Sequence, residues 1–155
     1  RAAILYAFEQ VGGAQRCQEL AVEYVKERKT FSRQVGSYQA VKHKLARMYA
    51  QNELARSNAY YGAWALASGS EELPLAAAAA RISATNCFEF AAREGLHLHG
   101  GMGYTWEVDC HLYLKRSRDL ALKVGSSRCW NEKLIATALA CMNDTEKVPT
   151  WLANS

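Results

Sequence analysis

The sequence predicts an all-α protein: an antiparallel up-down four-helix bundle over residues 1–142, followed by an irregular tail over residues 143–155. Three observations indicate this class. Apolar residues recur at three-to-four spacing along long stretches of the chain. Alanine is abundant, and only 2 prolines occur in 155 residues. The breaks between the helical stretches are short, which is typical of helices that pack antiparallel to their neighbours.

The first half of the chain is expected to hold two helices. The first is predicted over residues 1–29, where apolar positions lie on one face. Residues 30–37 are expected to form a loop, and Ser37 is the expected N-cap of the following helix. That second helix is predicted over residues 38–68.

Proline and glycine indicate the ends of the remaining helices. Pro74 is expected in the first turn of a third helix, where its missing N–H removes no hydrogen bond. Gly100 and Gly101 are expected to stop that helix. Residues 110–142 form a fourth helical region, with a break expected near Gly125.

Composition excludes several classes of function. The formal net charge of +4 is modest, and basic residues alternate with acidic ones, unlike the dense basic face of a nucleic-acid binder. The sequence contains no apolar run of about 18 residues, so no membrane span is predicted. Five irregularly spaced cysteines without a C-x-x-C pair indicate buried free thiols in a reducing compartment. Because Arg1 begins an apparent helix, the chain is expected to be a piece of a longer protein.

One window, "LHLHGGMGYTWEVD" at 96–109, is unusually rich in glycine and histidine. His97 and His99 diverge by about 200° on a regular helix, so no metal site is predicted from them. The glycines lack the Lys-Ser/Thr pair of a P-loop. Two interpretations stay open, a helix stop and a turn that exposes its backbone to a ligand. Gly12 and Gly13, inside the first helix, indicate close helix packing.

A second window, "KERKTFSRQVG" at 26–36, gathers cations at a helix end. Such cations suit the helix dipole, so a solvated helix end is one interpretation. In the other, Arg28 binds a phosphate with its planar guanidinium and Phe31 covers a flat ring system. No catalytic acid or base follows from spacing alone.

Together the two windows resemble a known family. "VEYVKERKTFSRQVGSYQAVKHKLARM", followed later by "LHLHGGMGYTWEVDCHLYLKRSRD", resembles the C-terminal helical domain of the acyl-CoA dehydrogenases, and the resemblance covers residues 1–140. It implies a FAD flavoprotein of fatty acid metabolism that dehydrogenates acyl-CoA thioesters at the α,β bond. It also implies homo-oligomers, electron-transfer flavoprotein as the acceptor, and a location in the bacterial cytoplasm or the mitochondrial matrix.

The resemblance assigns binding roles to five residues. Arg28 would meet the FAD pyrophosphate of the neighbouring subunit, and Phe31 would lie near its adenosine part. Gly100 and Gly101 would let the backbone approach the same cofactor. His97 stands where the family usually has Gln and would donate the equivalent hydrogen bond.

The catalytic base departs from the family pattern. Most members carry a Glu before a Gly-Thr pair, and Val124 falls at that position here. A minority place the base near the start of the first bundle helix, around Ala2. Glu9 lies two turns further on and faces the same side, so it is the candidate base within this chain.

Three hypotheses follow. The parent is an active acyl-CoA dehydrogenase whose base is Glu9 or lies outside this chain. Alternatively, it is a non-catalytic subunit that completes the FAD site of an active partner in a hetero-oligomer. In the third, the bundle is only an assembly module. The fragment alone is expected to be inactive and, with its interface uncovered, to self-associate.

Overall fold

The computed structural model describes residues 1–143 and consists mainly of five helices. They are α1 (Ala2–Glu27), α2 (Gln39–Ser68), α3 (Leu73–Leu98), α4 (Cys110–Leu122) and α5 (Ser127–Asn143). Two short 3₁₀ turns, η1 (Val35–Ser37) and η2 (Gly100–Tyr104), and two strands, β1 (Lys29–Thr30) and β2 (Arg33–Gln34), complete the described part. The all-α class is confirmed. Apart from Asn143, the expected irregular tail lies outside the described residues.

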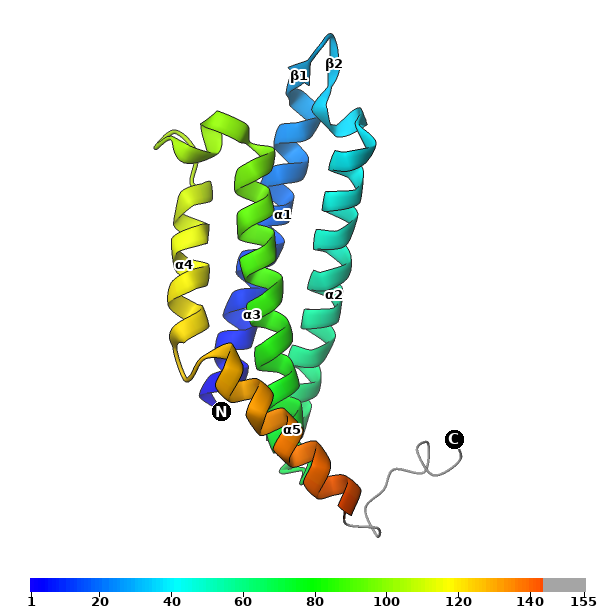
Figure 1. The fold of residues 1–155 in the computed structure, drawn as a ribbon, viewed down its shortest axis with the longest axis vertical. Helices are drawn as coiled ribbons and strands as arrows, with labels where there is room; N and C mark the ends of the chain where they lie inside the picture. Colours follow the sequence, from blue (N-terminus) through cyan, green and yellow to red (C-terminus); the bar gives the residue numbers. More distant parts are fainter. Residues whose placement is uncertain (144–155) are drawn as a thin grey trace.

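Helices α1 to α4 run side by side with alternating direction, while α5 crosses the end of the bundle where α4 finishes (Figure 1). The break expected near Gly125 is confirmed, because α4 ends at Leu122 and α5 starts at Ser127. Helix α5 packs mainly on α3. The fourth helical region is therefore two helices, and only the first continues the alternating bundle.

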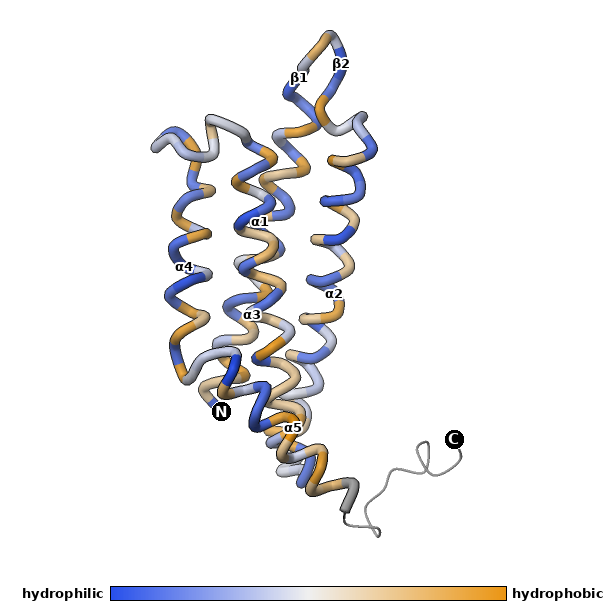
Figure 2. Tube along the Cα trace, viewed as in Figure 1, coloured by the Kyte–Doolittle hydropathy of each residue, from blue (hydrophilic) through white to orange (hydrophobic). Residues whose placement is uncertain are grey.

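Small side chains bring α1 and α3 together, and these two helices make the most extensive contact in the described part of the chain. Ala7, Ala14 and Ala21 on α1 are fully buried, and α3 contributes Ala80 and Ala84 to the same cluster. Alanine allows two helix backbones to approach closely because its side chain adds little width. Hydrophilic and hydrophobic positions alternate along each helix, as an amphipathic bundle requires (Figure 2).

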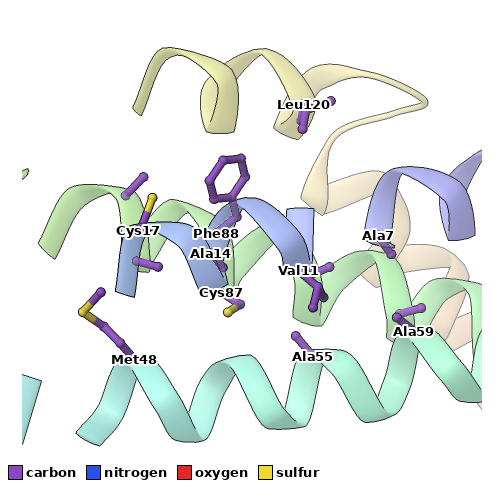
Figure 3. Close-up of a cluster of buried hydrophobic side chains, with 14 of the residues drawn as sticks. Ala7, Val11, Ala14, Cys17, Met48, Ala55, Ala59, Cys87, Phe88 and Leu120 are labelled. Carbon is purple, nitrogen blue, oxygen red and sulfur yellow. The ribbon is translucent and has the colours of Figure 1, made fainter. Parts of the chain in front are cut away.

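Phe88 fills the space between α1, α3 and α4 (Figure 3). Its side chain is 2% exposed, and a Cβ placed on Gly13 would lie only 2.6 Å from its Cζ atom. The close packing predicted at Gly13 is thus confirmed. Gly12 differs, because nothing lies within 4 Å of a Cβ placed there. The prediction for Gly12 is wrong, since this residue faces away from the neighbouring helices.

A buried arginine links three helices. Arg81 on α3 is 1% exposed and donates to Gln10 Oε1 of α1 at 2.6 Å and to the Lys123 carbonyl at 2.8 Å. It also donates to the Leu120 carbonyl in the last turn of α4. Burial lowers the pKa of this guanidinium, but the group stays charged because its ordinary pKa is so high. Arg81 therefore places a cation at the negative end of the α4 dipole.

None of the five cysteines forms a disulfide. Cys17, Cys87 and Cys110 are buried, whereas Cys129 is half-buried and Cys141 is exposed, so the expectation of buried thiols holds for three. Burial raises the pKa of Cys17 and of Cys87 to about 12, and both thiols therefore stay protonated near neutral pH. They act as small packing groups. None of the helices within residues 1–143 is long and apolar enough to cross a lipid bilayer.

The connection between α1 and α2 differs from the expected loop. Lys29–Thr30 and Arg33–Gln34 pair as an antiparallel hairpin, and η1 follows it. Ser37 is not the N-cap of α2, because Tyr38 holds that position and makes no side-chain cap. The Ser37 hydroxyl instead donates to the Gln34 carbonyl at 2.6 Å. The hydroxyl thus stabilises the turn at η1 and does not cap the start of α2.

Candidate functional site

A hollow of about 430 Å³ lies where α1 ends and α3 turns into η2. It joins the two sequence windows, which lie far apart along the chain. The residues that line it are Tyr24, Arg28, Thr30, Val35, Leu98, His99, Gly100, Gly101 and Met102. Its volume is at the lower end of the range of about 300–1,000 Å³ for small-molecule sites. The hollow can therefore hold part of a dinucleotide, with the rest extending beyond this chain.

Arg28 occupies the C-cap position of α1 and contributes the hollow's cationic group. Its backbone is fixed on both sides, because its N–H donates to the Tyr24 carbonyl at 2.9 Å and its carbonyl accepts from Val35 N at 2.8 Å. Its guanidinium makes no hydrogen bond or ion pair with any residue in the described part of the chain. An exposed cation without a protein partner on a fixed backbone is suited to an anionic ligand.

The other predicted residue of that window, Phe31, lies outside the hollow. It forms the tip of the β1–β2 hairpin, which projects beyond the ends of the helices (Figure 1). Phe31 and Ser32 have φ angles of 52° and 63°, the two left-handed residues of a type I′ turn. The Phe31 ring is 89% exposed. Within this chain the structure therefore does not bring Phe31 together with Arg28, and the ring is presented outward.

The turn η2 forms a corner after α3, and its three glycines have three different roles. Gly100 has a φ of 59° and reverses the chain direction after α3, which matches the predicted helix stop. A Cβ on Gly103 would lie 2.6 Å from the Leu96 carbonyl oxygen, so this residue allows close backbone packing. Gly101 lines the hollow, and a Cβ there would meet nothing within 4 Å. The corner thus stops α3 at Gly100, as one interpretation predicted, and leaves Gly101 exposed where it lines the hollow.

The structure places His99, and not the predicted His97, at the hollow. His97 has a half-exposed side chain whose Nδ1 lies 3.9 Å from Glu94 Oε1, and it is not part of the hollow's lining. His99 is 4% exposed and lines the hollow. Its ring stacks on Tyr24 at 4.5 Å between centroids with an interplanar angle of 28°.

Sequence reasoning missed Tyr24 and His99 as lining residues. One signal could have indicated Tyr24, because it precedes Arg28 by one helical turn and shares its face of α1. His99 gives no such signal, since it is the C-cap of α3 and its direction depends on the turn at Gly100.

Neither candidate position for a base lies at the hollow. Glu9 is on the flank of α1 that faces α4, where its side chain is 42% exposed and accepts from Arg116 Nε at 2.9 Å. It lies about 28 Å from Arg28 along the helix axis at about 1.5 Å per residue. Val124 follows α4 with a φ of 62°, and its carbonyl accepts from Trp130 Nε1 at 3.0 Å.

The hollow itself offers no acid or base of the carboxylate type, because its lining residues include neither Asp nor Glu. Over residues 1–143 the structure places no group of three or more His, Cys, Asp or Glu side chains around a common point for a metal ion. The arrangement is that of a binding surface, with one cation, an uncovered glycine backbone and a buried imidazole.

Comparison with known proteins identifies the family. The sequence profile described as "Acyl-CoA dehydrogenase, C-terminal domain" matches residues 1–140. The chain belongs to the acyl-CoA dehydrogenase family. Acyl-CoA dehydrogenase IpdE2 of Mycobacterium tuberculosis is 44% identical over 127 residues, which are 82% of this chain and 38% of that protein. The chain therefore corresponds to well under half of this acyl-CoA dehydrogenase relative.

Solved structures agree with this family. Butyryl-CoA dehydrogenase from Megasphaera elsdenii superimposes with a TM-score of 0.85 at 26% identity, over 88% of this chain and 36% of that one. The ChsE4-ChsE5 complex from Mycobacterium tuberculosis gives a TM-score of 0.82 at 25% identity, over 89% and 37%. The described helices therefore have the arrangement found in a region of these larger chains.

Proposed function

We propose that this chain is the C-terminal domain of a FAD-dependent acyl-CoA dehydrogenase and that it forms one wall of the FAD site of a neighbouring subunit. The observation that carries the proposal is the hollow itself. It combines the unpaired guanidinium of Arg28 with the uncovered backbone of Gly101, at the point where the two family windows meet. Both groups suit a pyrophosphate, because guanidinium and backbone N–H groups donate to phosphate oxygens.

Each part of the wall would have a separate task. Arg28 would bind the pyrophosphate, Gly100 and Gly101 would let the backbone approach it, and the projecting Phe31 would cover the adenosine part from outside the hollow. FAD, when bound, supplies the redox chemistry by accepting a hydride from the β carbon of an acyl-CoA substrate. This chain would orient the cofactor, and electron-transfer flavoprotein would receive the electrons. The family resemblance also implies a hydrogen bond from His97, whose side chain does not line the hollow.

Replacing Arg28 with methionine is expected to weaken FAD binding by the parent protein about 10- to 100-fold, the equivalent of about 1.5–3 kcal/mol for a hydrogen-bonded charged group. Lys29→Met is the matched control, since it removes the same charge from the adjacent residue, which does not line the hollow. Flavin content and the Kd for FAD measure the effect. Equal losses in the two variants would mean that general charge, rather than a specific contact, determines affinity.

Glu9 remains the proposed base within this chain. Glu9→Gln is expected to abolish turnover while flavin stays bound, because an amide cannot accept the α proton. Arg116→Met is the control, since it breaks the same ion pair but keeps the carboxylate. An exposed ion pair stabilises by about 0–1 kcal/mol, so both variants should fold. Unchanged turnover in Glu9→Gln would remove Glu9 from the mechanism and leave the base outside this chain.

The alternative is that the parent is a non-catalytic subunit completing the FAD site of an active partner. Two observations favour it. Residue 124 carries no carboxylate, and the similar ChsE4-ChsE5 structure is a complex of two named components. Flavin content per chain and turnover of a short panel of acyl-CoAs by the purified parent would separate the hypotheses. Turnover by a homo-oligomer excludes the alternative, whereas no FAD and no turnover without a partner excludes an independent enzyme.

A further inference from the structure

His99, at the edge of the hollow, has one ring nitrogen fixed by the fold. Its Nδ1 lies 2.7 Å from the Gly95 carbonyl oxygen, one turn earlier on α3. A carbonyl oxygen only accepts hydrogen bonds, so Nδ1 carries the proton. The Cys110 thiol, 3.4 Å from the same nitrogen, is a weak partner that does not change this assignment. In the neutral imidazole, Nε2 is therefore the nitrogen with a free lone pair.

Nothing in the described part of the chain bonds to that second nitrogen. Among residues 1–143, the side-chain polar atoms that are fully enclosed and lack a partner include Arg81 Nε and His111 Nε2, but not His99 Nε2. His99 Nε2 is therefore not fully enclosed. The His99 side chain is nevertheless 4% exposed, and Tyr24 stacks on its ring. Nε2 is therefore reached from the hollow that His99 lines, and the ring is held in one orientation.

We infer that His99, rather than His97, is the histidine that contacts the cofactor, and that its Nε2 accepts a hydrogen bond from a sugar hydroxyl. This inference rests on the proposed function. The hollow offers a guanidinium donor on Arg28 and an imidazole acceptor on His99. A phosphate oxygen would be bound by the donor, and only a ligand group with its own hydrogen can satisfy the acceptor. A hydroxyl beside a phosphate is found in FAD on both the ribityl chain and the ribose.

The test compares three variants of the full-length parent in its assembled state, with FAD affinity measured by titration of the apoprotein. In His99→Asn the amide nitrogen can keep the bond to the Gly95 carbonyl, but no atom replaces Nε2. We expect Kd to rise about five- to tenfold, as for the loss of one neutral hydrogen bond. In His99→Gln the amide reaches the Nε2 position, so Kd should stay within about twofold of the wild type. His97→Asn tests the histidine that the family resemblance implies, and under this inference it should leave Kd unchanged because His97 does not line the hollow.

A measurement on the wild-type protein keeps the inference testable if His99→Asn does not fold. FAD analogues that each lack one ribityl or ribose hydroxyl are titrated into the apoprotein. One of them should bind about five- to tenfold more weakly than FAD, and this difference should disappear in a folded His99→Asn variant. If every analogue binds as FAD does, no hydroxyl contact exists and the inference is overturned.

The outcomes separate this inference from the proposed function. If the parent and its assemblies bind no FAD, or if Arg28→Met leaves the affinity unchanged, the proposed function fails. If Arg28→Met weakens binding but His99→Asn does not, only the role of His99 is wrong. If His97→Asn weakens binding as much as His99→Asn does, the contact belongs to neither histidine specifically and the inference is overturned.

Discussion

Replacing Arg81 with methionine is expected to lower the free energy of unfolding by about 3 kcal/mol, one of the two largest effects expected in this chain. The substitution keeps an unbranched side chain of moderate volume but removes all donors. The carbonyls of Leu120 and Lys123 lose their guanidinium partner, and Gln10 Oε1 keeps only Thr85 Oγ1 at 3.3 Å. Each buried acceptor left without a partner costs about 1–3 kcal/mol.

A competing effect could reduce this loss. A buried charge is expensive to desolvate, and replacing buried charged groups with apolar ones is sometimes neutral. No carboxylate in the described part of the chain pairs with Arg81. Hydrogen bonds to three acceptors, one on α1 and two at the C-terminal end of α4, must then offset the desolvation. We expect them to dominate, because methionine leaves the acceptors in place and still buried.

Urea denaturation of the 155-residue chain, followed by circular dichroism, would measure the effect. Arg128→Met is the control, since its ion pair with Glu132 has side chains 88% and 63% exposed, and it should change stability by less than about 0.5 kcal/mol. Arg81→Lys should fall between the two, because one ammonium reaches fewer acceptors. A stable Arg81→Met variant would mean that desolvation balances the hydrogen bonds.

Phe88→Ala is expected to destabilise the chain by about 3–5 kcal/mol, through lost burial and the cavity left between α1, α3 and α4.

The Phe88→Ala substitution should also reverse the effect of Gly13→Ala on stability. With Phe88 present, Gly13→Ala drives a Cβ to 2.6 Å from the ring and should cost about 1–3 kcal/mol. In the Phe88→Ala background, the same methyl enters empty space, and better helix propensity should stabilise the chain by up to about 1 kcal/mol.

The neighbouring glycine provides the control for this pair. Gly12→Ala meets nothing within 4 Å, so it should stabilise the chain by about 1 kcal/mol with either residue at position 88. Thermal and urea unfolding of the four Gly13 and Phe88 combinations give the coupling between them. An effect of Gly13→Ala that is the same in both backgrounds would contradict the close contact.

Sequence reasoning predicted the helices well because each one carries its own signal. Apolar spacing predicted α1 to α3, Pro74 matched the start of α3, and Gly125 matched the gap between α4 and α5. The hairpin was missed because strands of two residues are too short to show periodicity. The Ser37 cap was wrong because Tyr38 is the N-cap of α2, and the Ser37 hydroxyl bonds back to the Gln34 carbonyl at the start of η1.

The candidate site was harder to predict, for physical reasons. The sequence indicated Arg28 and the glycine corner, since both lie in recognisable windows. The direction of the His99 side chain depends on the chain reversal at Gly100. A single residue determines this reversal, and no periodic pattern in the sequence indicates it. Arg81 was also missed, because a charged residue is rarely buried and only the tertiary structure supplies its acceptors.

The alanine-lined contact between α1 and α3 limits how this chain can vary. Because fully buried methyl groups such as those of Ala14 and Ala84 separate the two backbones, any larger side chain there must push the helices apart and disturb the hollow at their end. Homologous sequences should therefore diverge freely on the outer surface of α2 and keep small residues along this line. A saturation mutagenesis scan should show that larger side chains are not tolerated at these positions along the length of the bundle.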